Sequence, residues 1–472
     1  FRVPRRVLKQ MTATVSAKEL FRSRSVTPFL LASVASTMAA MIQITALGKQ
    51  IYDMTGRDLD LGLLGLAEFA PAFFLMTVTG SFADRYDRRH IASIGLIVEV
   101  ITTGMLAWYV STNPTDTTPI FAIVIAFGIG RAFVSPATRS MPADIAPDGG
   151  LPRLIAFHVG GWQASAIIGP VAAGFLFVGS PSWPFIACMI LAATGAVLIQ
   201  FAKPRHDRVA PGVSLAGGQD ASLIELGDQM RPAEMLDVLG EHNAEHIAHG
   251  STTPSATSDI KKKKKRTFHE AFEGFRVIRR NPALLGAISL DLFAVLFGGA
   301  VALLPAIAEN RLNVGAVGLG WLRAAGGIGA AVVTILLSIK PIQRRTGPVM
   351  FISVALFGVF TITLGLTHSF AIAFLSVMLL SAADSVSVYI RSTLVPLVTP
   401  SSARGRVMAV EGVFIGASNE LGAFESGVAG QLLGTGRAVV LGGVATIGVV
   451  IAWIVLFPVL WRYDRFPEHP PD

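Results

Sequence analysis

The sequence predicts an all-α membrane protein with twelve transmembrane helices in two repeats of six. The chain of 472 residues is 52% hydrophobic and only 15% charged, with a mean hydropathy of +0.59, which is too apolar for a soluble protein of this size. Its apolar runs are long enough to cross a bilayer core of about 30 Å as helices, and they are too long and unbroken for barrel strands.

The apolar runs form two groups of six, separated by a polar stretch. The first-half spans are predicted at 26–50, 60–83, 90–111, 118–139, 153–178 and 183–202. The second-half spans are predicted at 283–307, 315–339, 348–367, 370–395, 407–434 and 438–461. We therefore expect a cytoplasmic N-terminal segment (1–25), an N-terminal bundle (26–202), a cytoplasmic linker (203–281), a C-terminal bundle (282–462) and a cytoplasmic tail (463–472).

The charge distribution predicts the orientation of the chain. Lys and Arg cluster in the loops on one side of the predicted spans, which places both termini in the cytoplasm by the positive-inside rule. The net charge of +8 comes in short clusters between apolar runs, so we expect the lipid bilayer, and not nucleic acid, to be its partner. In the linker, His242, His246 and His249 have a spacing that could hold a metal on one helical face, but a solvated linker is the preferred interpretation. We therefore expect no metal and no cofactor, and we expect a monomer.

The two halves share a sparse internal repeat, which predicts a pseudo-two-fold axis along the membrane normal and a substrate cavity between the halves. At an offset of 253 residues, the matching pairs are Gly62 with Gly315, Gly65 with Gly318, Ala156 with Ala409, Gly169 with Gly422, and Gly174 with Gly427.

Charged residues inside the predicted spans indicate where function lies. Each costs at least about 2.5 kcal/mol in a bilayer, so it needs a partner or a water-filled environment. We expect Asp291 and Glu68 to carry protons, with Asp384 and Glu425 as further candidates, and Arg131 to hold such a carboxylate ionised. The alternative for any one of these residues is a buried structural ion pair.

Polar residues are rare in the third, sixth, ninth and twelfth spans, which predicts that these spans face lipid while the others line the cavity. In the eleventh span, Glu411, Ser418, Gly422 and Glu425 share one helical face, which we expect to point into the cavity. Aromatic residues near the charges suit an apolar or aromatic ligand, although they are equally typical of helix packing. The candidate cavity residues are Gln43, Phe69, Gln163, Phe293, Arg323 and Asn419.

Two short motifs suggest moving parts. In the loop after the second span, Asp84 is surrounded by basic residues that could latch one conformation, or that could simply keep the loop inside. The members of this latch motif are Gly80, Asp84, Arg85, Arg88 and Arg89. In the fifth span, Gly169, Pro170 and Gly174 allow close helix packing and a bend, as a rocking transporter needs and as ordinary helix packing also uses.

Both motifs resemble those of the major facilitator superfamily, over almost all of the chain outside the linker. The loop resembles the superfamily's loop 2–3 motif with Asp87 in place of a usual glycine, and the fifth span resembles the antiporter motif. The stretches 291–305, 403–407 and 418–422 are similar to the bacterial branch of enterobactin exporters and related multidrug efflux proteins. The resemblance implies the major facilitator fold, alternating access, proton-driven export and a bacterial inner membrane.

These observations predict a proton-coupled exporter of a small amphipathic molecule, either a siderophore or a drug-like compound. A proton-coupled uptake symporter and a non-transporting membrane sensor or scaffold are the alternatives. An enzyme is not expected, because the spans contain no apparent pair of nucleophile and base and the chain has no phosphate-binding Gly-x-x-x-x-Gly-Lys-Ser/Thr motif.

Overall fold

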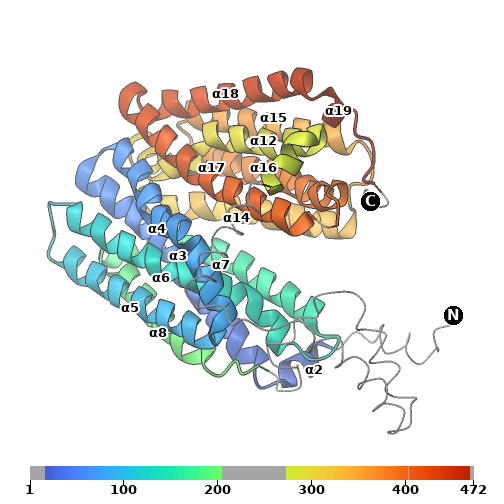
Figure 1. The fold of residues 1–472 in the computed structure, drawn as a ribbon. Coiled ribbons are helices and arrows are strands. Elements are labelled where there is room, and N and C mark those ends of the chain that lie inside the picture. Colours follow the sequence, from blue (N-terminus) through green and yellow to red (C-terminus); the bar gives the residue numbers. More distant parts are fainter. Residues whose placement is uncertain (1–15, 205–272, 402, 468–472) are drawn as a thin grey trace, which may run out of the picture. The chain divides into compact units, whose positions relative to one another are not determined.

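The computed structural model describes residues 16–204, 273–401 and 403–467, without the side chains of 76–78 and 80–85. Most of the expected linker 203–281 and the first part of the N-terminal segment therefore lie outside the described residues. The part of the chain that is described folds into helices joined by short loops, and it contains no strand (Figure 1).

The described part of the first half contains one short helix followed by six long ones, all shown in Figure 1. They are α2 (Ala17–Arg22), α3 (Val26–Thr55), α4 (Asp58–Arg85), α5 (Arg88–Ser111), α6 (Thr118–Ile145), α7 (Leu151–Gly179) and α8 (Trp183–Ile199). Each long helix overlaps one predicted span of this half. Local signals fix the ends of these helices: Gly56 ends α3 with a φ of 62°, and the Asp87 side chain caps the start of α5.

The second half begins with helical residues 273–280 and then follows the predicted order. Its elements are α12 (Pro282–Phe297), η1 (Gly299–Leu303), α13 (Leu304–Ala306), η2 (Ile307–Arg311), α14 (Gly315–Ile339), α15 (Thr346–Leu366), α16 (Phe370–Val398), α17 (Arg404–Leu433), α18 (Thr435–Leu456) and α19 (Pro458–Trp461). Counting η1, α13 and η2 with α12, nine helical segments of the described chain are long and apolar enough to cross a membrane.

The seventh predicted span, 283–307, is not one regular helix as expected. The α-helix α12 ends at Phe297, and the chain continues as the short 3-10 turn η1, the short helix α13 and the π turn η2. Gly299 lies directly against the Gly422 backbone of α17, where a Cβ would collide, and Pro305 has no N–H to donate to a preceding turn. The break therefore lets α12 and η1 pack closely against α17.

Two seams join the halves, one between α7 and α14 and the other between α4 and α17. Glycines make these close approaches possible. A Cβ on Gly174 would lie 2.6 Å from the Ala316 carbonyl oxygen, and one on Gly320 would lie 2.5 Å from the Pro170 carbonyl oxygen. Pro170 and Gly174 of the expected packing motif thus lie in the seam between the halves, whereas Gly169 packs on Met41 of α3.

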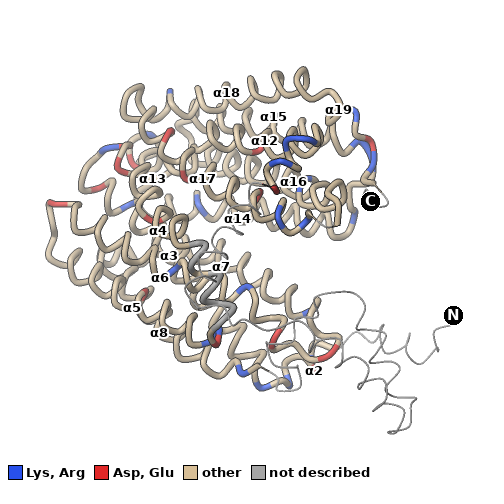
Figure 2. The backbone as a smooth tube through the Cα atoms, in the orientation of Figure 1, with Lys and Arg blue, Asp and Glu red and all other residues tan. Residues whose placement is uncertain are grey.

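The halves are joined firmly at one end, which we name the closed end. There the Asn310 amide donates to the Tyr52 hydroxyl at 2.5 Å, and the Thr435 hydroxyl donates to Asp58 at 2.7 Å. At the opposite, open end of the same helices, a Cβ added to Gly160 or Gly412 would meet no atom within 4 Å. Charged residues are sparse along the middle of the helices (Figure 2).

The packing predicts opposite effects for two glycine-to-alanine substitutions in the second half. Gly329 lies directly against the Met378 backbone of α16, so Gly329→Ala should lower stability by about 1–3 kcal/mol through overpacking. Gly448→Ala is the matched control, since its Cβ would enter open space and alanine favours helix. The midpoint of thermal unfolding in detergent measures both, and equal shifts would contradict the close α14–α16 packing.

Candidate functional site

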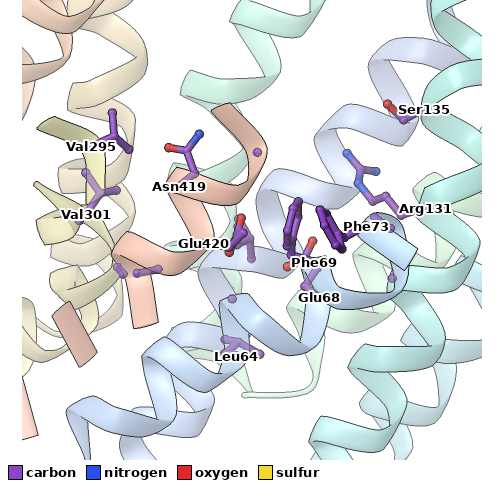
Figure 3. Close-up of a pocket in the computed structure, with 18 of the residues that line it drawn as sticks. Leu64, Glu68, Phe69, Phe73, Arg131, Ser135, Val295, Val301, Asn419 and Glu420 are labelled. Carbon is purple, nitrogen blue, oxygen red and sulfur yellow. The ribbon is translucent and has the colours of Figure 1, made fainter. Parts of the chain in front are cut away.

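A cavity of about 830 Å³ lies between the halves (Figure 3). The first half lines it with α3, α4 and α6, and the second half with α12, η1, α14, α15, α16 and α17. Its volume is in the range of small-molecule sites, about 300–1,000 Å³. Of the four helices expected to face lipid, α5, α8 and α18 contribute no lining residue and α15 contributes Phe357.

Six of the residues predicted from sequence meet in this cavity. They are Glu68, Phe69, Arg131, Arg323, Asp384 and Asn419. They come from α4, α6, α14, α16 and α17, so both halves supply charge. In Figure 3, Glu68 and Phe69 on α4 share the space with Asn419 and Glu420 on α17. The structure therefore brings together side chains up to about 350 residues apart in the sequence, as the repeat predicted.

Arg131 has a carboxylate behind it. Its Nη1 lies 3.6 Å from Oε1 of Glu99 on α5, and the Glu99 side chain is 1% exposed. Neither carboxylate oxygen of Glu99 has a hydrogen-bond partner. Glu99 thus offsets the charge of Arg131 from outside the cavity. In the sequence, Glu99 is the only charged residue in the interior of its predicted span.

Three carboxylates face the cavity without a close partner. No hydrogen bond or ion pair connects Glu68, Asp384 or Glu420 to another described residue, and all three line the cavity. Glu68 is within electrostatic reach of Arg131 and Arg323. Glu420 was not among the predicted site residues, and it fits against Gly65, where a Cβ would lie 2.6 Å from its Oε2.

Asp291 belongs to a buried ion network beside the cavity. Arg391 on α16 is 3% exposed and pairs with Asp291 on α12 and, at 3.4 Å, with Glu411 on α17. Asp291 and Asp384 both line a small void of about 10 Å³, which is close to the smallest space that holds one water. Asp291 thus contributes to holding three helices together, next to a carboxylate that faces the main cavity.

The polar stripe of α17 faces the other way from the expected direction. Glu411 contacts Arg391, and Gly422 contacts η1, so the stripe of Glu411, Ser418, Gly422 and Glu425 packs mainly within its own half. The cavity is instead lined by the neighbouring face, which contains Gly412, Val413, Gly416, Asn419, Glu420 and Ala423. The spacing identified the helix, but buried partners set its rotation.

Four further candidates lie outside the cavity lining: Gln163, Phe293, Gln43 and Glu425. Gln163 donates from Nε2 to the Gly327 carbonyl oxygen at 2.6 Å across the α7–α14 seam. Phe293 packs on Trp453 with ring centroids 5.2 Å apart, and Gln43 is 2% exposed inside the first half. Glu425, proposed as a proton carrier, accepts from the neighbouring Ser426 hydroxyl at 3.5 Å. Gln163 and Glu425 are thus engaged by hydrogen bonds, whereas the Gln43 amide has no hydrogen-bond partner among the described residues.

The basic loop between α4 and α5 is paired within the first half. Arg88 donates to Asp144 of α6 at 2.6 Å, and Arg89 donates to Asp87 at 2.5 Å. These hydrogen bonds from Arg89 hold the pKa of Asp87 below its usual value, so Asp87 stays ionised. The remaining latch residues, Gly80, Asp84 and Arg85, lie among those whose side chains are not described.

A charged cluster at the closed end was not predicted. Lys49 on α3 pairs with Asp53 one turn further along, and its Nζ lies 3.1 Å from Oε2 of Glu309 in η2. This contact joins the two halves and must break if the closed end opens. The i, i+4 spacing of Lys49 and Asp53 was the sequence signal that could have indicated it.

Comparisons with known proteins agree with this architecture. A family model described as Major Facilitator Superfamily matches residues 29–348. No curated protein matches the sequence.

Among solved structures, a peptide transporter POT is similar with a TM-score of 0.67 and 14% identity, covering 98% of this chain and 99% of that one. The nucleoside transporter NupG is similar with a TM-score of 0.57 and 14% identity, covering 93% of this chain and 99% of that one. A bacterial homolog of the human lysosomal transporter Spinster, inward-facing and unoccupied, is similar with a TM-score of 0.59 and 15% identity. The match covers 93% of this chain and 96% of that one. At these identities the likeness shows a shared fold.

The ion network of Arg391 predicts a large and reversible loss of stability. Arg391→Met leaves two buried carboxylates without a cation and should lower the free energy of unfolding by about 3–5 kcal/mol. Adding Asp291→Asn and Glu411→Gln removes those charges and should restore most of the loss. Arg139→Met, at an exposed position, is the control. Unfolding of the purified variants in detergent measures the effect. If Arg391→Met alone were as stable as wild type, the ion network would be refuted.

Proposed function

Because the chain belongs to the major facilitator superfamily, we propose that it moves a small amphipathic molecule across the membrane by alternating access, coupled to protons. The observation that carries this proposal is the cavity between the halves, closed at one end and lined by unpaired carboxylates. A carrier of this fold binds its substrate in such a cavity and is a transporter, not an enzyme.

The predicted orientation gives the cavity a direction. The short helix α2 adjoins the start of α3, and α19 adjoins the end of α18; both lie at the open end of the bundle. If both termini are cytoplasmic, the structure is an inward-open state in which Lys49 and Glu309 help to close the outer side. Rocking of the halves would then open the closed end and shut the cytoplasmic mouth.

The residues proposed for proton coupling follow from their partners. Glu68, Asp384 and Glu420 line the cavity without a close cation, so each can gain or lose a proton without breaking a buried ion pair. Arg131 is offset by Glu99, and Asp291 is engaged by Arg391. We therefore place the coupling protons on the three cavity carboxylates, with Asp291 connected to Asp384 through the small void.

Export is the first candidate direction, in a monomer of the bacterial inner membrane. The glycine-containing seam of α7 supports it, because that motif resembles the antiporter motif and lies where the halves move against each other. Charged groups and the aromatic rings of Phe69 and Phe73 line the same cavity, as binding of an amphipathic molecule such as a drug-like compound or siderophore requires.

Uptake with protons is the second candidate, and the electrostatic interaction between two cavity residues favours it. Arg323 lies within electrostatic reach of Glu68. Neutralising Glu68 would free Arg323 for an anion, so that a proton and an anionic substrate would bind together, as symport requires.

Transport by the purified chain in liposomes tests the proposal. Ethidium and dansyl-phenylalanine serve as a cationic and an anionic probe. Accumulation in liposomes with an acidic interior, abolished by a protonophore, supports antiport and export. Accumulation with an acidic exterior supports uptake. Absence of gradient-driven movement of both probes, relative to protein-free liposomes, contradicts the proposed function.

Substitutions in α16 and α17 should locate the coupling. Asp384→Asn and Glu420→Gln are each expected to lower gradient-driven flux at least about tenfold, because they remove proton sites in the cavity. Glu425→Gln is the matched control on α17, since its side chain lies outside the cavity lining. Equal losses in all three variants, or none in the two cavity variants, would place coupling elsewhere.

A further inference from the structure

Arg323 is a cavity guanidinium without a partner among the described residues. It lies on α14 and lines the cavity, and no hydrogen bond or ion pair connects it to another described residue. Its Nε is buried and has no hydrogen-bond partner. The other two arginines of the cavity differ, because Arg131 pairs with Glu99 and Arg139 is exposed. Arg323, which is half-buried, is thus the arginine of the described lining that lacks an anion.

The chemistry of arginine makes this observation informative. A cavity carboxylate can become neutral by binding a proton, but a guanidinium keeps its charge throughout the physiological range. A permanent charge among membrane helices is costly unless a partner offsets it. Since no carboxylate in the described chain bonds to Arg323, the missing partner is expected to come from outside the protein.

The space for that partner is the cavity that Arg323 lines. Gly48 faces the guanidinium, and a Cβ there would lie 3.4 Å from Nη2 of Arg323 and 3.1 Å from Pro305. Glu68 influences Arg323 electrostatically without bonding to it. The planar fork of a guanidinium binds a carboxylate or another oxyanion through two parallel hydrogen bonds. Glu68 therefore acts as an electrostatic competitor for the anion.

An apolar surface lies in the same cavity. The rings of Phe69 and Phe73 on α4 are 5.8 Å apart, and both line the cavity together with Glu68 (Figure 3). A ligand that places an oxyanion on Arg323 could lay an aromatic or aliphatic body against these rings, which would remove apolar surface from water.

We propose that Arg323 binds an anionic group of the transported molecule, so that the substrate is a small amphipathic organic anion whose apolar body contacts Phe69 and Phe73. This inference rests on the proposed function and specifies its substrate class. Arg323 recognises the charge, and the phenylalanine pair accommodates the body.

A matched pair of fluorescent probes tests the proposal by equilibrium binding. Dansyl-phenylalanine carries a carboxylate, and dansyl-phenylalanine amide has nearly the same shape without the charge. Both are titrated against the purified full chain in nanodiscs of neutral lipid, with empty nanodiscs subtracted. Wild type should bind the acid about tenfold more tightly than the amide, the gain expected from one charge-assisted pair. Arg323→Gln should abolish this preference, and the control Arg437→Gln, at an exposed position outside the cavity lining, should keep it.

Two further variants separate recognition from folding. Glu68→Gln removes the competing charge and should tighten binding of the acid about threefold to tenfold, with the amide unchanged. If Arg323→Gln fails to fold, the double variant Glu68→Gln/Arg323→Gln has no buried charge at this point and should bind acid and amide equally.

The outcomes are decisive in either direction. Equal binding of acid and amide by wild type, a preserved preference after Arg323→Gln, or no saturable binding of either probe would overturn the anion site. Liposome transport is measured on the same preparations. Gradient-driven flux of ethidium without an Arg323-dependent preference would leave the proposed function intact while refuting this inference. An Arg323-dependent preference without flux would support the anion site while contradicting the proposed transport function.

Discussion

The pairing of ionised side chains inside the helical bundles is the constraint on which the rest of this structure depends. A charge among membrane helices is tolerated when a partner or water compensates it. Arg391 holds α12, α16 and α17 together through Asp291 and Glu411, and Glu99 offsets Arg131 from behind. Glu68, Arg323, Asp384 and Glu420 are half-buried, have no close partner in the described chain and line the cavity.

Close backbone contact is the second requirement for a carrier that rocks. Glycines at both seams let α7 approach α14 and α4 approach α17 with little side chain between them. Such contacts depend on van der Waals packing and contain few directional bonds, so they can slide or separate at modest cost. At the closed end, Lys49, Tyr52 and Asp58 add polar contacts that give this state a defined geometry.

Hydrophobic length and charge placement made the helical elements predictable from the sequence. The predicted spans agree with the observed helices, often within a few residues, because a span must cover the bilayer core. The broken seventh span was not predicted, since Gly299 is needed only because Gly422 approaches it from another helix. Irregularity of this kind depends on a tertiary contact that no local pattern shows.

The candidate site was predictable in part. An intramembrane charge marks a functional helix, and Glu68, Arg131, Arg323 and Asp384 indeed meet in one cavity. The rotation of a helix is less certain from sequence, because a shift of one residue turns the face by about 100°. Glu411 therefore faces Arg391 while Glu420 faces the cavity. Glu99 lies on the helix before that of Arg131, and Arg391 lies three spans after Asp291; the fold shows that they pair.

The central claim is that the halves rock about the cavity, so that one end opens as the other closes. Double electron–electron resonance on the full chain tests it most directly. One label pair at Ile155 and Ile339 reports on the open end, and another at Arg57 and Arg437 reports on the closed end; all four positions are exposed. Lys49→Gln leaves Asp53 and Glu309 without their shared cation and should favour opening of the closed end. The account predicts a longer distance at the closed end together with a shorter one at the open end. Distances that change independently, or that stay fixed in both pairs, would contradict it.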